Sequence, residues 1–77
     1  MGNIIGLERR FGVIAVKKGF ISAEQLFEAL KIQVTEDLEG KKHRSIGTIL
    51  HDEGFISFKQ VNEVRRSLTK PLYDLQP

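Results

Sequence analysis

Apolar residues recur along the chain at steps of three and four positions, the spacing that places side chains on one face of an α-helix. Four such stretches follow one another from about residue 7 onward, and residues 1–6 are expected to form a loose lead-in. No strand is predicted. The pattern therefore indicates an all-α protein, a small bundle of about four helices. The apolar positions that define the four helix faces are Leu7, Phe11, Ile14 and Ala15; Leu26, Ala29 and Leu30; Ile46, Ile49 and Leu50; and Val61, Val64 and Leu68.

The predicted helix ends are marked by glycine and by a Ser-x-x-Gln sequence. Gly19 can take the left-handed conformation that closes the first helix, and Gly40 can close the second. Ser22 and Gln25 have the spacing of a capping box, in which each side chain bonds the backbone N–H of the other residue. The first two helices are thus joined by very few residues, which requires a sharp turn and predicts a helix-turn-helix unit.

The second half of the chain repeats the first after a shift of about 35 residues, inside the range of repeated supersecondary units. The sequence therefore predicts one domain over residues 1–77, made of two pseudo-repeated helix-turn-helix units. The first covers about 8–38, the second about 44–70, and residues 71–77 form a tail. After this shift, identical residues align in eight pairs: Gly12 and Gly47, Ile14 and Ile49, Gly19 and Gly54, Phe20 and Phe55, Ile21 and Ile56, Ser22 and Ser57, Gln25 and Gln60, and Glu28 and Glu63.

Composition narrows the classes of function. The chain has 77 residues, 40% of them apolar and 29% charged, as expected for one small globular domain. The absence of cysteine excludes disulfides, thiolate metal sites and a cysteine nucleophile. No apolar run is long enough to cross a bilayer and no signal-peptide pattern is present, so we expect no membrane insertion and a cytoplasmic location. A net charge of +2 is compatible with an anionic ligand, but it does not by itself indicate a nucleic-acid-binding protein.

Two glycines fall inside predicted helices, where glycine costs up to about 1 kcal/mol relative to alanine. Gly12 and Gly47 each lie near the start of a helix. Close helix packing explains them, and so does a ligand that approaches the helix backbone. Arg9, Arg10 and Arg44 lie beside these glycines, and a guanidinium can grip a phosphate or a guanine edge. The sequence alone does not decide between helix packing and ligand approach.

These residues carry a resemblance to a known family. Arg10-Phe11-Gly12, Gly19-Phe20-Ile21, Leu26, Ala29-Leu30 and Gln33 resemble one copy of the tandem motif in the N-terminal domains of type II secretion and type IV pilus assembly ATPases. In the MshE-like branch of that family, the paired motifs bind cyclic-di-GMP. The resemblance covers roughly residues 9–68 and implies a regulatory or docking role. It implies no motor activity, because the 77 residues contain no ATPase domain.

The second copy of the motif departs from the family pattern. Ser45 stands at the arginine position, with Arg44 one place early, Arg65 replaces an apolar residue, and Leu68 replaces the glutamine. The resemblance implies that Arg10 contacts phosphate or guanine, that Gly12 admits the ligand and that Gln33 supplies an amide. The residues of the candidate ligand site are Arg10, Phe11, Gly12, Gln33, Arg44, Ile46 and Gly47.

No catalytic, cofactor or metal site is predicted. His51, Asp52 and Glu53 are adjacent, so their side chains point around a helix and do not converge on one ion. No phosphate loop or catalytic triad is present.

A helix-turn-helix DNA-binding protein is a competing interpretation. Recognition helices usually begin with side chains that reach base edges. The second helices of the two units begin instead with Ala23-Glu24 and Phe58-Lys59. The basic residues of the last helix are Lys59, Arg65, Arg66 and Lys70.

The sequence thus predicts a non-catalytic regulatory or interaction module that binds cyclic-di-GMP or docks on a protein. The alternative is a pure protein-interaction domain that has lost the nucleotide, with Leu72, Tyr73 and Leu75 as an apolar interface.

Overall fold

A computed structural model describes the backbone of residues 3–69 and the side chains of residues 8–68. Within that range the chain forms four helices and no strand: α1 (Asn3–Lys17), α2 (Ala23–Leu38), α3 (Ile46–Asp52) and α4 (Phe58–Thr69). The prediction of an all-α bundle of about four helices is confirmed. The predicted tail over 71–77, with Leu72, Tyr73 and Leu75, lies outside the described residues.

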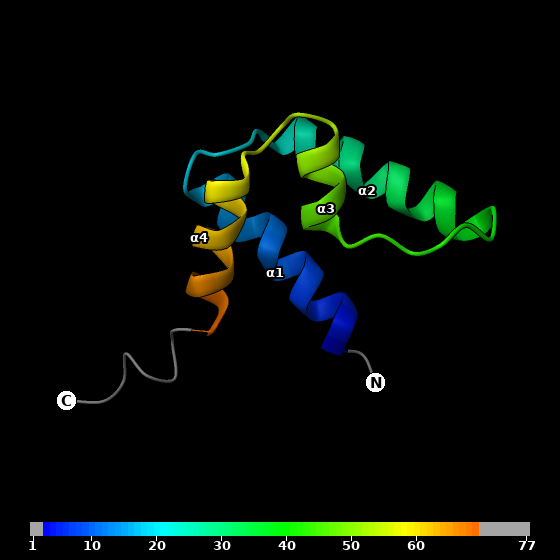
Figure 1. Ribbon diagram of the computed structural model, residues 1–77, viewed down its shortest axis with the longest axis horizontal. Coiled ribbons are helices and arrows are strands. Elements are labelled where there is room, and N and C mark those ends of the chain that lie inside the picture. The colour runs from blue at the N-terminus through cyan, green and yellow to red at the C-terminus, as the bar shows by residue number, and fades with distance from the viewer. Residues whose placement is uncertain (1–2, 70–77) are drawn as a thin grey trace.

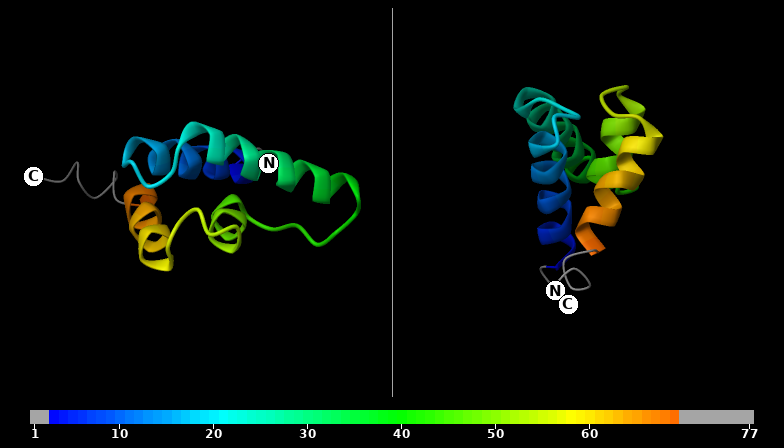
Figure 2. Two further views of the ribbon diagram at one scale, coloured as in Figure 1. Left: turned by 90° about the horizontal axis from the view of Figure 1, so that it is seen from above. Right: turned by 90° about the vertical axis from the view of Figure 1, so that its left-hand side faces the viewer.

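The four helices pack as two layers. Seen from above, α1 and α2 form one layer and α3 and α4 the other (Figure 2). α1 contacts each of the other three helices, and α2 packs on α3 (Figure 1). The C-terminal turns of α2 and the connector that follows reach beyond α3 (Figure 1). One side of α1 and one side of α2 are therefore left without a helix upon them.

The loose lead-in predicted for residues 1–6 is wrong for residues 3–6, because α1 already begins at Asn3, and residues 1–2 lie outside the described residues. Ile4 and Ile5 extend the apolar spacing that Leu7 and Phe11 continue, at steps of three and four. Periodicity therefore reaches one turn further toward the N-terminus than predicted.

The first helix closes as its sequence predicts. Gly19 has a φ of 78°, a left-handed conformation that glycine adopts without steric cost. The N–H of Phe20 donates to the carbonyl of Ala15 at 3.0 Å, and the N–H of Gly19 donates to that of Val16 at 2.9 Å. This is the Schellman hydrogen-bond pattern. Gly54 closes α3 with a φ of 79° and the equivalent bonds.

Both predicted capping boxes are present. The N–H of Gln25 donates to Ser22 Oγ at 3.1 Å, and the N–H of Ser22 donates to Gln25 Oε1 at 2.9 Å. Ser57 and Gln60 exchange the same two bonds at 3.0 and 3.1 Å. The two units thus share the same local geometry at matching positions, while their origin by duplication stays a prediction.

The core draws on all four helices. Ile21 and Ile56, which precede the two capping serines, are 5% and 4% exposed and pack into it. No helix in residues 3–69 combines the length and the apolar character needed to cross a membrane. The buried apolar residues are Phe11, Ala15, Ile21, Ala29, Ile46, Ile49, Leu50, Ile56, Val61 and Val64.

Candidate functional site

One carboxylate of α1 joins three parts of the chain. Glu8 Oε1 accepts hydrogen bonds from the side-chain amide of Gln33 on α2 and from the backbone N–H of Ile46, at 3.0 Å in the second case. Glu8 Oε2 lies 3.1 Å from His43 Nε2 in the connector. The Glu8 side chain is only 15% exposed. We call Glu8, Gln33, His43 and Ile46 the Glu8 cluster.

The Gln33 amide is used within this cluster. Its Nε2 donates to Glu8 and also to the backbone carbonyl of Arg44, at 2.9 Å in the second bond. An amide nitrogen has two hydrogens, so both are occupied by the protein itself. Gln33 thus fastens the connector to α2, and it offers no free donor to a ligand in this arrangement.

Arg44 is held in a similar way. Its Nε and Nη2 donate to the two carboxylate oxygens of Glu36 at 3.0 and 2.5 Å, and its Nη1 donates to Asp52 at 2.9 Å. This forked, charge-assisted pair lowers the pKa of Glu36 and raises that of Arg44. The guanidinium predicted to grip a phosphate is therefore occupied by two carboxylates of the same chain.

His43 lies between two carboxylates. Its Nδ1 is 3.0 Å from Asp37 Oδ1, and its Nε2 is 3.1 Å from Glu8 Oε2. Hydrogen bonding to Asp37, and then to Glu8, raises the pKa of His43 above its ordinary value. The protonated ring can donate to both carboxylates at once, and it closes the polar side of the Glu8 cluster.

The two helical glycines lie at close contacts within the protein. A Cβ at Gly12 would lie 2.5 Å from Leu26 Cδ1, which is closer than real Cβ atoms come. A Cβ at Gly47 would lie 3.0 Å from Phe11 Cζ. Gly12 lets α1 approach α2, and Gly47 lets α3 approach α1. This geometry supports the packing explanation of the two glycines.

Three of the predicted site residues line a common concavity. Phe11, Ile46 and Gly47 border a volume of about 160 Å³ between α1, α3 and α4, with Glu8 and Arg65 at its edge. Arg10 is not among its lining residues. The seven predicted residues thus lie in four places: this concavity, the Glu8 cluster with Arg44, the contact of Gly12 with α2, and the outer side of α1.

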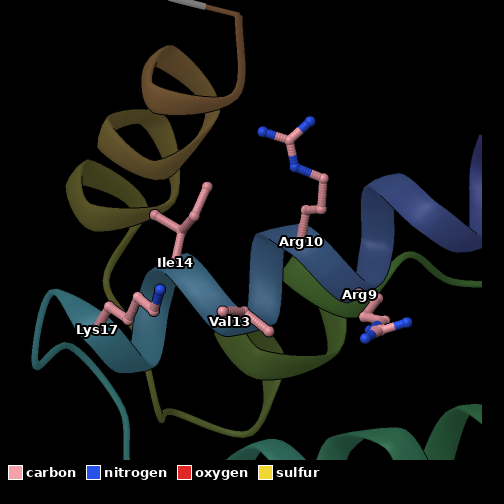
Figure 3. A pocket seen from close by; sticks show the side chains of 5 residues that line it. All are labelled: Arg9, Arg10, Val13, Ile14 and Lys17. Atoms are coloured by element: carbon pink, nitrogen blue, oxygen red, sulfur yellow. The ribbon is translucent and has the colours of Figure 1, made fainter. Parts of the chain in front are cut away.

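Arg10 belongs to a larger, basic concavity of about 470 Å³ on α1. Its described lining consists of Arg9, Arg10, Val13, Ile14 and Lys17, which we call the α1 basic face (Figure 3). Arg10 and Ile14 project to the side on which α4 lies, and Arg9 projects away from it (Figure 3). The three cations make no hydrogen bond or ion pair within the described part of the chain. They are therefore available to an anionic or acidic partner.

The outer side of α2 exposes three large apolar side chains. Phe27 is 65% exposed, Val34 54% and Leu38 83%. Their spacing of seven and four residues places them on one helix face, opposite the buried Ala29. We call Phe27, Val34 and Leu38 the α2 apolar face. No side chain among residues 8–68 covers these three residues.

Sequence reasoning missed Glu8 and Ser45. Ser45 is the N-cap of α3, and its Oγ accepts from the backbone N–H of Thr48 at 3.2 Å. A serine directly before an apolar helix face was a usable signal for this cap. The role of Glu8 had no local signal, because Gln33 and Ile46 lie 25 and 38 residues further along the chain.

Comparison with protein-family models, with curated proteins and with solved structures finds no match to this chain. Among the described residues, no group of three or more His, Asp or Glu side chains could hold a metal ion. The function must therefore be inferred from the surfaces of the molecule.

Proposed function

We propose that the chain is a non-catalytic interaction module that docks on a protein partner through the α2 apolar face. The observation that carries this proposal is the exposure of Phe27, Val34 and Leu38 on one side of a single helix. Soluble monomers rarely expose large apolar side chains together, and such patches usually mark an interface. A docking role is also what the resemblance to secretion-ATPase N-terminal domains implies.

The partner that fits this face is a helix with an apolar stripe of its own. Val34 and Leu38 are four residues apart, and the stem of Lys31 lies between Phe27 and Val34 on the same face. The face therefore runs along most of α2 and is narrow. A second helix can cover such a stripe by the packing of ridges into grooves.

Site-specific photocrosslinking in the native cell tests the proposal. A benzoylphenylalanine replaces Phe27 in one variant, Val34 in a second and the exposed Lys59 of α4 in a control. We expect an adduct of one mass at positions 27 and 34 and none at position 59. Failure to form an adduct on α2, or an equal yield at all three positions, would contradict the proposal.

Cyclic-di-GMP binding is the second candidate function, and one observation favours it. Arg9 and Arg10 line the basic concavity of α1 and have no ion pair within the described residues, and guanidinium groups bind phosphate well. Its support is weaker because Gln33 and Arg44 are bonded within the protein and Leu26 covers Gly12.

An NMR titration separates the two functions. Saturable shifts at Arg10 and Gly12 that are lost in Arg10→Ala would favour the nucleotide. Unchanged spectra at millimolar cyclic-di-GMP would exclude it and leave the docking proposal intact.

A further inference from the structure

The two surfaces that the fold leaves uncovered carry opposite charge. In α2, Glu36 and Asp37 are bonded to Arg44 and His43. The remaining charges of α2 are Glu24, Glu28 and Lys31, whereas the exposed charges of α1 are Arg9, Arg10 and Lys17. The one carboxylate of α1, Glu8, is turned inward to the Glu8 cluster. Both surfaces also expose an apolar side chain, Phe27 on α2 and Val13 on α1.

We propose that the partner of the α2 apolar face is the α1 basic face of a second copy of this chain. This inference rests on the proposed docking role and names its partner. The two faces belong to different sides of one molecule, so the contact is heterologous. Repeated from copy to copy, it builds an open chain or closes into a ring.

Charged residues surround Val13 on α1 and Phe27 on α2, the two exposed apolar residues at the centres of the faces. Val13 has cations three and four residues before it and four residues after it on α1. Phe27 has Glu24 three residues before it and Glu28 next to it on α2, both of them exposed. The charges around the apolar centre of α1 are all positive. Around Phe27 on α2 two are negative, and Lys31, four residues after Phe27, is positive. The apolar side chains can meet while the opposite charges pair at the edge.

The lengths of the two faces are also compatible. The cations at the two ends of the α1 basic face, Arg9 and Lys17, are eight residues apart, about 12 Å along the helix. Glu24 and Glu28 are four residues apart, about 6 Å. Both carboxylates therefore fall within the length covered by the cations, whose long side chains reach along the helix surface.

Charge argues against the simpler pairing of α2 with α2 of a second copy. That isologous contact would bring two helix faces together that each carry Glu24 and Glu28 against the one lysine, Lys31. Like charges at a contact destabilise it, whereas complementary charges set the partner and its orientation. The contact area of two single helix faces is small, so we expect weak association that needs concentrated protein.

Analytical ultracentrifugation of charge-reversed variants tests this inference. One variant carries Arg9→Glu and Arg10→Glu, and another carries Glu24→Arg and Glu28→Arg. The control carries Lys42→Glu and Lys59→Glu, which matches the charge change of the α1 variant at exposed positions that belong to neither face. Circular dichroism checks that each variant is folded.

We expect the average mass of the native chain to rise beyond that of a dimer between micromolar and millimolar concentration, and less so at high salt. Each charge-reversed variant alone should lose this rise, and the control should keep it. An equimolar mixture of the two variants should regain it, because reversed α1 and reversed α2 are again complementary.

Two results would overturn the inference. A native chain that stays monomeric at millimolar concentration removes the second copy as partner, and photocrosslinking to a different protein would then still support docking. A mass that stops at the dimer and is unaffected by the α1 variant would instead assign the contact to α2 alone.

Discussion

Polar and apolar side chains have different roles on the two sides of α1 and α2, the inner side that faces the rest of the protein and the outer side. On the inner side, Glu8, Gln33 and Arg44 bond one another or their neighbours, and no buried side-chain nitrogen or oxygen in the described part of the chain lacks a partner. On the outer side, Arg10 has no ion pair with any residue that the structure describes, and Phe27 is 65% exposed. The same two helices thus have one side that completes the fold and one that lacks a partner.

This difference decides which chemically notable residues can act on another molecule. Arg44 and Gln33 have the side chains expected of a ligand site, yet their donors are used to hold the connector in place. Val13 and Phe27 have no distinctive chemistry, yet they are exposed on the sides that no helix covers. A candidate site is therefore better judged by the partners that a side chain already has than by its type.

Of the variants proposed here, Glu8→Ala is expected to lower the free energy of unfolding most, and it tests the inner side. The change removes an acceptor shared by Gln33, His43 and the N–H of Ile46, a residue that is 1% exposed. Loss of a charged acceptor and exposure of a buried donor without a partner should lower the free energy of unfolding by roughly 2–3 kcal/mol. Urea unfolding followed by circular dichroism measures it.

Glu28→Ala is the matched control for that variant. Glu28 is exposed on α2, and its change should alter the free energy of unfolding by no more than about 0.5 kcal/mol. Equal stabilities of the two variants would mean that the Glu8 cluster does not hold the helices together.

Much of the fold could be predicted because its signals are local. Gly19 with Phe20, and Ser22 with Gln25, act within a few residues of one another, so their spacing alone predicts a helix end and a capping box. The four helices follow from apolar periodicity, which is also local.

The candidate site could not be predicted in the same way. Whether Gly12 admits a ligand or packs against Leu26 depends on a helix that lies elsewhere in the sequence. Arg44 likewise meets Glu36 and Asp52, each eight residues away, only after the connector has folded back on α2. The sequence alone does not show which of these charged residues pair with one another in the fold.

A smaller effect is expected from the titration of His43, whose side chain is half exposed. Asp37 and Glu8 raise its pKa in the folded state, so its contribution to stability is complete below the unfolded pKa of about 6.5. It is lost as the pH rises through the folded-state pKa. The free energy of unfolding should therefore be lower at about pH 8 than at about pH 6.

Substitution of His43 by glutamine isolates this contribution. The difference in unfolding free energy between the two pH values should shrink in His43→Gln, because the titrating group is gone. An unchanged pH dependence in the variant would mean that His43 does not link the connector to Glu8 and Asp37.

The most direct test of the account compares two neighbouring residues of α2 by urea unfolding in dilute protein. Leu26 packs against the core beside Gly12, whereas Phe27 lies on the α2 apolar face. We predict that Leu26→Ala lowers the free energy of unfolding by about 2 kcal/mol, and that Phe27→Ala changes it by no more than about 0.5 kcal/mol. A larger loss from Phe27→Ala than from Leu26→Ala would show that the outer side of α2 belongs to the core, which would contradict its role as a docking surface.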